Sequence, residues 1–470
     1  MPNDILNGKV VPSSGEGGLG APTRHPIEWQ DPAYYDEEGL DSELRRVFDI
    51  CHGCRRCFNL CDSFPRLFDL IDESDTGELD SVESEDFKSV VDACTFCDMC
   101  FLTKCPYVPP HEFNIDFPHL MLRYRAVENS KNQVPVTKRQ ISKTDRNGKV
   151  ASSISGLVNW ASSADNGVSR AVIEKTTGID RRASLPKFSK KTFSNGARSN
   201  MPDVNKEAPG YGRKAILYAT CFINYNNPLM GELTRKVLAH NGVTTEIIYP
   251  SCCGMPQLEQ GDLKEVSNKA KRVSTEMQPW VDKGYDVISL TPSCSLMLKF
   301  EWPLILPDNN DVLRLAEATS DVSEYIVELS KNEGLVEGLN PMPGPIALHL
   351  ACHSRAQNMG QKATELLSLI PDIDLNVVER CSGHGGTWGI YKENFDTSIK
   401  VGRPVANKSK EAAYIVSECP LAADHILQGL ELLSTKQGGS GEKSDRTFPS
   451  RSFHPVELFA AAYGFDSKNK

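Results

Sequence analysis

Eight of the fifteen cysteines in this 470-residue chain stand in two short runs. Each run has three cysteines separated by two residues and then a fourth; the runs are Cys51, Cys54, Cys57 and Cys61, then Cys94, Cys97, Cys100 and Cys105. From one tight loop, three such thiolates can reach three corners of a [4Fe–4S] cube, and the last corner is left for a distant sulfur. The runs therefore predict two [4Fe–4S] clusters and electron transfer.

The two runs resemble those of two-cluster bacterial ferredoxins, in which the fourth cysteine of each run binds the other cluster. This resemblance assigns the cluster ligands as Cys51, Cys54, Cys57 and Cys105 for the first cluster, and Cys94, Cys97, Cys100 and Cys61 for the second. Asp62 stands where a proline would follow Cys61, and four residues separate Cys100 from Cys105. Both departures indicate that the local turns differ from those of ferredoxins, while all eight cysteines remain available as ligands. Structural zinc is the alternative, although zinc sites usually pair two Cys-x-x-Cys knuckles or include histidine.

Composition narrows the class of protein. The net charge is −10 and no sustained basic stripe dominates, which argues against a nucleic-acid-binding protein. The first twenty residues lack a basic segment followed by an apolar one, so we expect no signal peptide and a cytoplasmic chain whose clustered cysteines bind metal rather than form disulfides. No apolar run approaches the roughly 18 residues of a membrane span, so membrane association would need a partner or a surface patch.

The chain is expected to divide into five parts. These are a flexible tail (1–40), a ferredoxin-type domain with two [4Fe–4S] clusters (41–128), an irregular basic connector (129–212), a first cysteine-rich α/β repeat (213–338), and a second such repeat with a C-terminal tail (339–470). The connector carries many basic residues: Lys138, Arg139, Lys143, Arg146, Lys149, Arg181, Arg182, Lys187, Lys190 and Lys191. It is either a plain linker or a basic surface for anionic lipid or an acidic partner.

The other seven cysteines each follow a short apolar run that has the character of a β-strand. These runs cover 215–219, 246–249, 287–290, 346–350, 375–378 and 413–416, and they lead to Cys221, Cys252 with Cys253, Cys294, Cys352, Cys381 and Cys419. Amphipathic stretches typical of helices lie between them, at 229–240, 264–281, 357–369 and 421–433. Alternating strands and helices predict a parallel sheet. The predicted fold is therefore an N-terminal helical, ferredoxin-like module followed by a duplicated α/β domain, and the whole chain is classed as α/β or α+β.

The cysteine order repeats. Cys221 and Cys252 are 31 positions apart, and Cys352 and Cys381 are 29 apart. The motif that begins at Cys252, Cys-Cys-Gly, aligns with the Cys-Ser-Gly that begins at Cys381. An internal duplication of one α/β unit is therefore predicted. Because ligands of open α/β sheets gather at the carboxyl ends of strands, the duplication predicts two thiolate-rich sites.

This arrangement resembles the cysteine-rich domains of the heterodisulfide reductase B subunit family. A ferredoxin module placed before two such domains is similar to the C-subunit family of anaerobic glycerol-3-phosphate dehydrogenase, and to the iron–sulfur subunits of glycolate and lactate oxidases. Residues 114–123, 353–358 and 379–388 share that likeness. The resemblance implies a subunit that carries electrons from a flavoprotein dehydrogenase towards quinone or a quinone-reducing membrane partner, on the cytoplasmic face of the inner membrane.

The two repeats differ from the full heterodisulfide reductase pattern in different ways. The first repeat has Thr291 in place of one cysteine and keeps Cys221, Cys252, Cys253 and Cys294, which suffice for a third cluster. The second has Ser382 in place of another and keeps Cys352, Cys381 and Cys419. Three thiolates can hold a cluster with one other ligand, a zinc ion, or nothing. His353 and His384 are the candidate fourth ligands.

Three functions from different classes remain open at this stage. The first is a non-catalytic electron-transfer subunit, favoured because the chain has no convincing flavin or nicotinamide fingerprint. The second is a heterodisulfide or thiol reductase that uses the duplicated domain as its active site, and the missing cysteines weigh against it. The third is a zinc-binding scaffold, against which the ferredoxin-like runs weigh.

Overall fold

The computed structural model describes residues 22–196, 201–437, 449 and 451–465, together with the backbone of two short strands, β1 (Ile5–Leu6) and β2 (Lys9–Val10). Within the predicted tail, residues 1–4, 7–8 and 11–21 lie outside the described residues. The chain forms two compact units. Unit 1 contains Met1–Pro135 with Gln257–Leu263 and Leu304–Pro307, and unit 2 contains the remainder.

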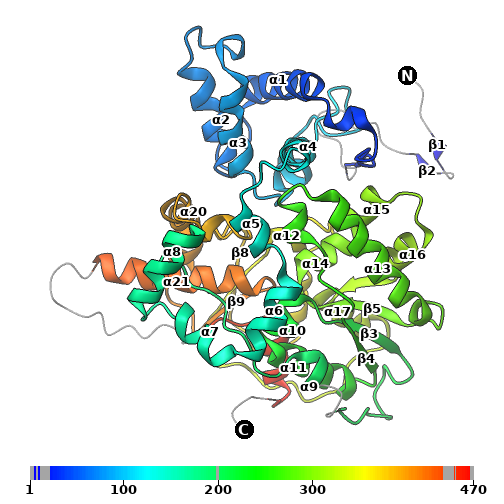
Figure 1. Cartoon of the computed structure of the whole chain (residues 1–470). Helices are drawn as coiled ribbons and strands as arrows, with labels where there is room; N and C mark the ends of the chain where they lie inside the picture. The colour runs from blue at the N-terminus through cyan, green and yellow to red at the C-terminus, as the bar shows by residue number, and fades with distance from the viewer. Residues whose placement is uncertain are drawn as a thin grey trace. The chain divides into compact units, whose positions relative to one another are not determined.

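Apart from the short strands β1 and β2, unit 1 is helical where it is described (Figure 1). Its helices are η1 (Pro32–Tyr35), α1 (Glu37–Cys54), α2 (Ser63–Asp72), η2 (Leu79–Ser81), η3 (Ser84–Asp86), α3 (Phe87–Ala93), the π-helical turn η4 (Cys100–Lys104) and α4 (Phe117–Ser130). Apolar residues at helical spacing bury one face of α1, for example Leu44 and Phe48. The Phe48 ring packs edge-on against Phe87 at 5.2 Å between centroids, so aromatic side chains form the core that holds the helices together.

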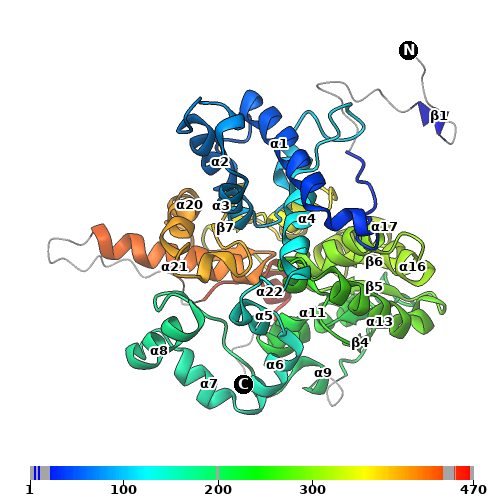
Figure 2. The same ribbon diagram turned by 45° about the horizontal axis from the view of Figure 1, so that its top comes forward.

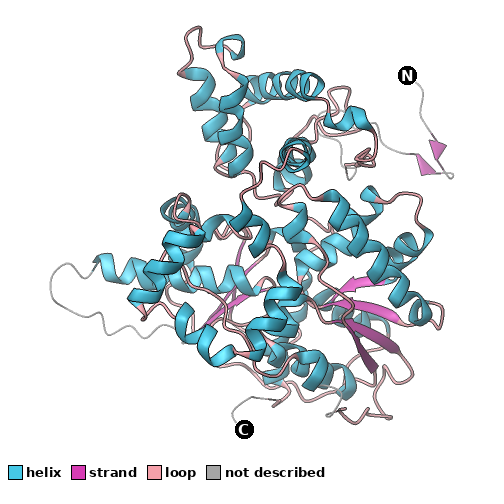
Figure 3. Cartoon of the chain, viewed as in Figure 1, coloured by secondary structure: helices cyan, strands magenta, loops and turns pink. Residues whose placement is uncertain are grey.

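Unit 2 contains two parallel sheets, which Figure 3 shows as two groups of strands covered by helices. Their orders are β4-β3-β5-β6 and β8-β7-β9. The strands are β3 (Lys214–Tyr218), β4 (Thr244–Ile248), β5 (Asp286–Ser289), β6 (Thr319–Asp321), β7 (Ile346–His349), β8 (Leu375–Val378) and β9 (Tyr414–Ser417). The six predicted strands are confirmed to within two residues, and the first three strands of each repeat share one order. The short β6 was not predicted, because its three residues carry no apolar run.

Helices cover both sheets. The first repeat has α10 (Cys221–Tyr225), α11 (Pro228–His240), α12 (Met255–Leu258), α13 (Leu263–Val281), α14 (Pro292–Leu296), η5 (Met297–Glu301), α15 (Trp302–Ile305), α16 (Asn310–Ala318) and α17 (Val322–Asn332). The second has α18 (Cys352–Arg355), α19 (Lys362–Leu367), η6 (Trp388–Ile390), α20 (Phe395–Lys408), α21 (Pro420–Gln437) and α22 (Pro455–Ala462). Of the predicted helices only 357–369 is much shorter in the structure. Side chains from both repeats, including Val237 and Leu366, share one hydrophobic core.

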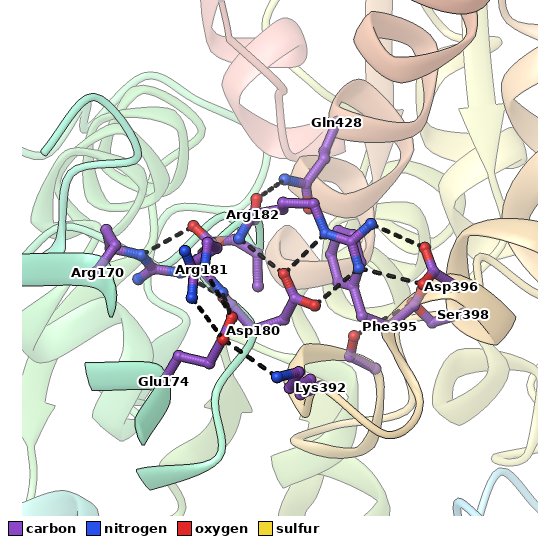
Figure 4. A network of polar contacts seen from close by, with 12 residues as sticks. Arg170, Glu174, Asp180, Arg181, Arg182, Lys392, Phe395, Asp396, Ser398 and Gln428 are labelled. Atoms are coloured by element: carbon purple, nitrogen blue, oxygen red, sulfur yellow. Dashed lines mark hydrogen bonds and ion pairs between the residues drawn. The ribbon is translucent and has the colours of Figure 1, made fainter. Parts of the chain in front are cut away.

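The segment 129–212, predicted as an irregular connector, contains helices of its own. They are α5 (Val136–Ile141), α6 (Thr144–Ser153), α7 (Ser155–Ser162), α8 (Gly167–Thr177) and α9 (Phe193–Gly196). After α8 the chain is fixed to the second repeat, where Arg182 bonds Asp180 at 2.8 Å and Asp396 of α20 at 2.9 Å (Figure 4). Gln428 of α21 donates to the carbonyl oxygen of Arg182 at 2.6 Å. The serine- and asparagine-rich composition concealed these helices from a sequence reading.

Candidate iron–sulfur sites

Four cysteines of unit 1 line one small pocket that is partly open to solvent. They are the residues assigned to the first cluster: Cys51, Cys54, Cys57 and Cys105. Burial, together with the neighbouring sulfurs of Cys105 and Cys57, raises the pKa of the Cys51 thiol well above its ordinary value. A raised pKa keeps these thiols protonated while no metal is bound. They lose their protons when they bind a positively charged metal centre. Four cysteines that line one pocket match the four iron corners of a [4Fe–4S] cluster.

The cysteines of the second run gather in the same way. Burial and the sulfurs of Cys97, Cys94 and Cys61 raise the pKa of the Cys100 thiol well above its ordinary value. The structure therefore brings Cys61, from the first run, to the cysteines of the second. The four residues that separate Cys100 from Cys105 form the π-helical turn η4, in which the amide of Cys105 donates to the carbonyl oxygen of Cys100 at 2.8 Å. The wider turn absorbs the additional residue and leaves Cys105 at the first site.

Residues between these cysteines adopt backbone conformations that L-amino acids rarely take. Arg55, Phe96 and Asp98 have φ angles of 52°, 49° and 60°. Left-handed residues cost energy and persist only where surrounding structure fixes them. For Asp98 the fixing group is Arg24, whose guanidinium bonds both carboxylate oxygens at 2.8 and 3.0 Å and also reaches Asp116 at 2.8 Å. The cysteine loop is thus held from outside by a buried ion pair.

The four cysteines of the first repeat are close together at the carboxyl ends of β3, β4 and β5. The sulfur atoms of Cys221 and Cys252 are 3.7 Å apart, and those of Cys253 and Cys294 are 3.2 Å apart. Contacts with the sulfurs of Cys221 and Cys253 lower the pKa of Cys252 well below its ordinary value, although burial opposes this. A lowered pKa favours the thiolate, which is the form that binds metal. This arrangement fits the predicted third cluster.

Three surrounding groups fix the Cys252–Cys253 loop. The Tyr218 hydroxyl donates to the carbonyl oxygen of Ser251 at 2.7 Å, and Trp302 Nε1 donates to the carbonyl oxygen of Cys253 at 3.0 Å. The third group is Asp145 of the connector, whose carboxylate accepts from the amide of Cys252 at 3.0 Å. Trp302 and Asp145 were not predicted as parts of the site. Neither lies in a cysteine motif, and no local pattern marks them.

The cysteines of the second repeat are arranged differently. Burial raises the pKa of Cys419 to about 11 and raises that of Cys381, against the effect of nearby backbone amides. No sulfur–sulfur contact joins these two residues. The contact between Cys253 and Cys294 at 3.2 Å in the first repeat therefore has no counterpart between Cys381 and Cys419. Across the described part of the chain, including the other cysteine sets, no three His, Cys, Asp or Glu side chains converge closely enough to hold a single metal ion.

The two candidate histidine ligands have different surroundings. His353 follows Cys352, and its Nδ1 lies 2.8 Å from the hydroxyl oxygen of Ser293, the neighbour of Cys294 in the first repeat. Helices α14 and α18 are in contact at this point. His384 is buried, and its Nε2 has no hydrogen-bond partner. The orphan nitrogen of His384 suits a metal ligand better than the hydrogen-bonded ring of His353.

The glycines beside Cys381 are explained mostly by packing. A Cβ atom on Gly383 would lie 2.0 Å from the carbonyl oxygen of Ser398, and one on Gly389 would lie 2.6 Å from that of His384. Gly383 also has a φ of 83°, close to the 91° of Gly254 at the equivalent place in the first repeat. These positions therefore require glycine because the backbones of the loop and α20 approach closely.

A buried carboxyl group in the second repeat was also missed. Burial, reinforced by the charge of Asp321, raises the pKa of Glu418 to about 8. Its carboxyl oxygen accepts from the amide of Ala351 at 3.3 Å. A possible signal was its position, directly before Cys419 in the sequence. Glu418 therefore places an ionisable group between the strand ends that carry Cys352 and Cys419.

Comparison with known proteins agrees with the duplication. The profile of the cysteine-rich domain matches residues 215–299 and 346–421, one match in each repeat. The chain is 30% identical over 284 residues to the C subunit of the anaerobic glycerol-3-phosphate dehydrogenase of Escherichia coli, which covers 59% of this chain and 69% of that protein. It is 29% identical over 188 residues to the lactate utilization protein A of Bacillus pumilus, a match that covers 38% of this chain and 75% of that protein. An uncharacterized iron–sulfur protein of Methanococcus maripaludis is 24% identical over 226 residues, a match that covers 46% of this chain and 42% of that protein.

Proposed function

Because this chain belongs to the C-subunit family of anaerobic glycerol-3-phosphate dehydrogenase, we propose that it is an iron–sulfur electron-transfer subunit. Its electron donor is a flavin-dependent dehydrogenase that oxidises glycerol 3-phosphate or a related 2-hydroxy acid, and its electrons go towards quinone. The observation that carries the proposal is the gathering of twelve cysteines into three sets of four. Each set supplies the thiolates that one [4Fe–4S] cluster needs.

The proposed ligands follow these sets. Unit 1 holds one cluster through Cys51, Cys54, Cys57 and Cys105, and another through Cys94, Cys97, Cys100 and Cys61. The first repeat holds a third through Cys221, Cys252, Cys253 and Cys294. When bound, such clusters take up and release single electrons. The protein contributes burial and hydrogen bonds around the sulfurs, which set their potentials.

The second repeat is proposed as a weaker site. Cys352, Cys381 and Cys419 supply three thiols, and His384 is the preferred fourth ligand because its buried Nε2 lacks a partner. Its occupant is either a cluster or zinc. Iron and zinc analysis of a Cys381→Ser variant distinguishes the two, because only one metal should fall. A variant with unchanged iron and zinc would show that the second repeat holds neither.

The connector offers a surface for docking. Leu157 and Trp160 of α7 are 62% and 63% exposed, and Val168 and Val172 of α8 are 81% and 58% exposed. Figures 1 and 2 both show α7 and α8 at the outside of unit 2. In the described residues, no helix has the length and apolar content needed to cross a bilayer. Exposed tryptophan and aliphatic side chains within a basic segment are typical of contact with an anionic membrane surface, and we assign that role to this face.

The main experiment uses anaerobically purified full-length chain. We expect about twelve irons and twelve sulfides from the three sets of four cysteines, and no oxidation of glycerol 3-phosphate or lactate by the chain alone. Its clusters should be reduced when the flavoprotein partner and substrate are added, and a quinone analogue should reoxidise the complex. Two metals per chain without sulfide would support a zinc scaffold. Rapid reduction of a disulfide substrate by the isolated chain would support a reductase.

Docking is tested separately with a Leu157→Ala/Trp160→Ala variant. Its sedimentation with vesicles containing anionic lipid should fall, while its iron content stays unchanged. A deletion of the connector would not serve, because it would also remove Asp145 from the Cys252 loop. Equal sedimentation of the variant and the native chain would contradict the membrane role.

A further inference from the structure

A charged pair from two distant segments lies against the third cysteine set. Asp145, in the first turn of α6, accepts from the amide of Cys252 at 3.0 Å and from the hydroxyl of Tyr249 at 2.6 Å. The ammonium of Lys269, on α13, donates to the same carboxylate at 2.9 Å. Both are partly buried, since the side chains of Asp145 and Lys269 are 25% and 11% exposed. Asp145 also lies outside the two segments that match the cysteine-rich domain.

The charge of the cysteine set reaches this pair. Burial lowers the pKa of the Lys269 ammonium, but Asp145 and the sulfur of Cys252 raise it above its ordinary value. The first turn of α6 therefore presents a carboxylate to the backbone amide of one proposed cluster ligand, Cys252.

We propose that Asp145 and Lys269 are positioning residues that set the reduction potential of the first-repeat cluster, an inference that rests on the proposed third cluster. One-electron reduction adds a negative charge to the cluster. A carboxylate beside the ligand loop disfavours that charge and an ammonium favours it, and partial burial strengthens both effects relative to water. The two side chains therefore act on the potential in opposite directions, while together they hold the loop.

The test is a redox titration of the full-length chain, followed by paramagnetic resonance. Asp145→Asn keeps the size and hydrogen-bond acceptor of the side chain and removes its charge, so the midpoint of the first-repeat cluster should move upward. Lys269→Met should move it downward. The double variant should lie between the two, near the native value. The potentials of the unit 1 clusters should not change in any of these variants.

Asp165→Asn is the matched control, because Asp165 is an exposed carboxylate of the same connector that accepts a hydrogen bond from Ser163. It should leave all potentials unchanged. Shifts of the same sign in Asp145→Asn and Lys269→Met, or no shift with full iron content, would overturn the inference. If the Asp145→Asn variant loses iron, the test relies on Lys269→Met alone. A midpoint potential that does not fall in that variant would then overturn the inference. Absence of a third cluster from the native chain would instead contradict the proposed function itself.

Discussion

The two cysteine-rich repeats have the same strand order, and both place a left-handed glycine after the second strand, Gly254 and Gly383. Their sites nevertheless differ. In the first repeat two pairs of sulfurs are in contact. In the second, Cys381 and Cys419 make no such contact, and buried histidines and Glu418 lie near the strand ends. The comparison shows that the sheet fixes where a site lies, and that loop and helix residues decide what it can hold.

The largest expected difference between the repeats concerns iron. Cys253 is buried and lies 3.2 Å from Cys294. Cys253→Ser should therefore remove the third cluster, about four irons per chain, together with its paramagnetic signal. Cys381→Ser should cost less iron. Iron, sulfide and spectra of the two variants give the measurement, and equal losses would contradict the asymmetry.

A smaller effect is expected from the group that holds the Cys253 loop. Trp302 is fully buried and donates to the carbonyl oxygen of Cys253. Trp302→Phe would leave that oxygen unsatisfied and should destabilise the fold by about 1–3 kcal/mol. The third cluster should also be lost sooner to a chelator, which can be followed by its absorbance. The control in the second repeat is Trp388→Phe, because the ring nitrogen of Trp388 has no hydrogen-bond partner to lose. Equal chelation rates in both variants would show that the Trp302 bond does not matter.

The repeats should also differ in acid sensitivity. Burial lowers the pKa of His349 and His425 to about 4 and that of His384 and His454 to about 3, all in the second repeat. Because the unfolded value is about 6.5, the unfolded state binds more protons below that pH. The free energy of unfolding is therefore highest above pH 6.5 and falls as the pH is lowered towards 4. Each histidine lowers it by up to about 1.4 kcal/mol per pH unit in this range.

His454 gives the clearest test, because it caps α22 by accepting from the amide of Val456 at 3.2 Å. His454→Gln should reduce the loss of hydrogen-exchange protection in α22 between pH 7 and pH 5, after correction for intrinsic rates. In the native chain, α22 should lose protection over this range and α13 of the first repeat should lose less. The same pH dependence in variant and native chain would rule out His454 as a source.

The smallest effect is expected where the connector meets the second repeat. Arg182 bonds Asp180 and Asp396, yet its side chain is 47% exposed. Exposed ion pairs contribute little, so Arg182→Ala should lower the free energy of unfolding by about 1 kcal/mol or less. Iron content should not change. A loss of third-cluster iron in Arg182→Ala would show that the two ends of the connector are coupled, and would weaken the contrast between the repeats.

The sequence by itself determined the six strands that precede the cysteines of the repeats, and the positions of the cysteines after them. Apolar runs of four or five residues before each cysteine were enough, because a buried parallel strand needs little more than such a run. Spacing also indicated that the first three cysteines of each run could share a site, and the resemblance to two-cluster ferredoxins predicted the fourth. Cys-x-x-Cys loops are local, so their geometry is visible in the sequence.

Only the tertiary structure decided which distant side chains meet the cysteines. Asp145 and Cys252 are more than a hundred positions apart, and Trp302 reaches Cys253 from beyond α13. It also decided that Cys381 and Cys419 do not meet as the sulfurs of Cys253 and Cys294 do. Hydrogen bonds and burial between distant segments arise from packing of the whole chain, and no period or spacing in the sequence records them.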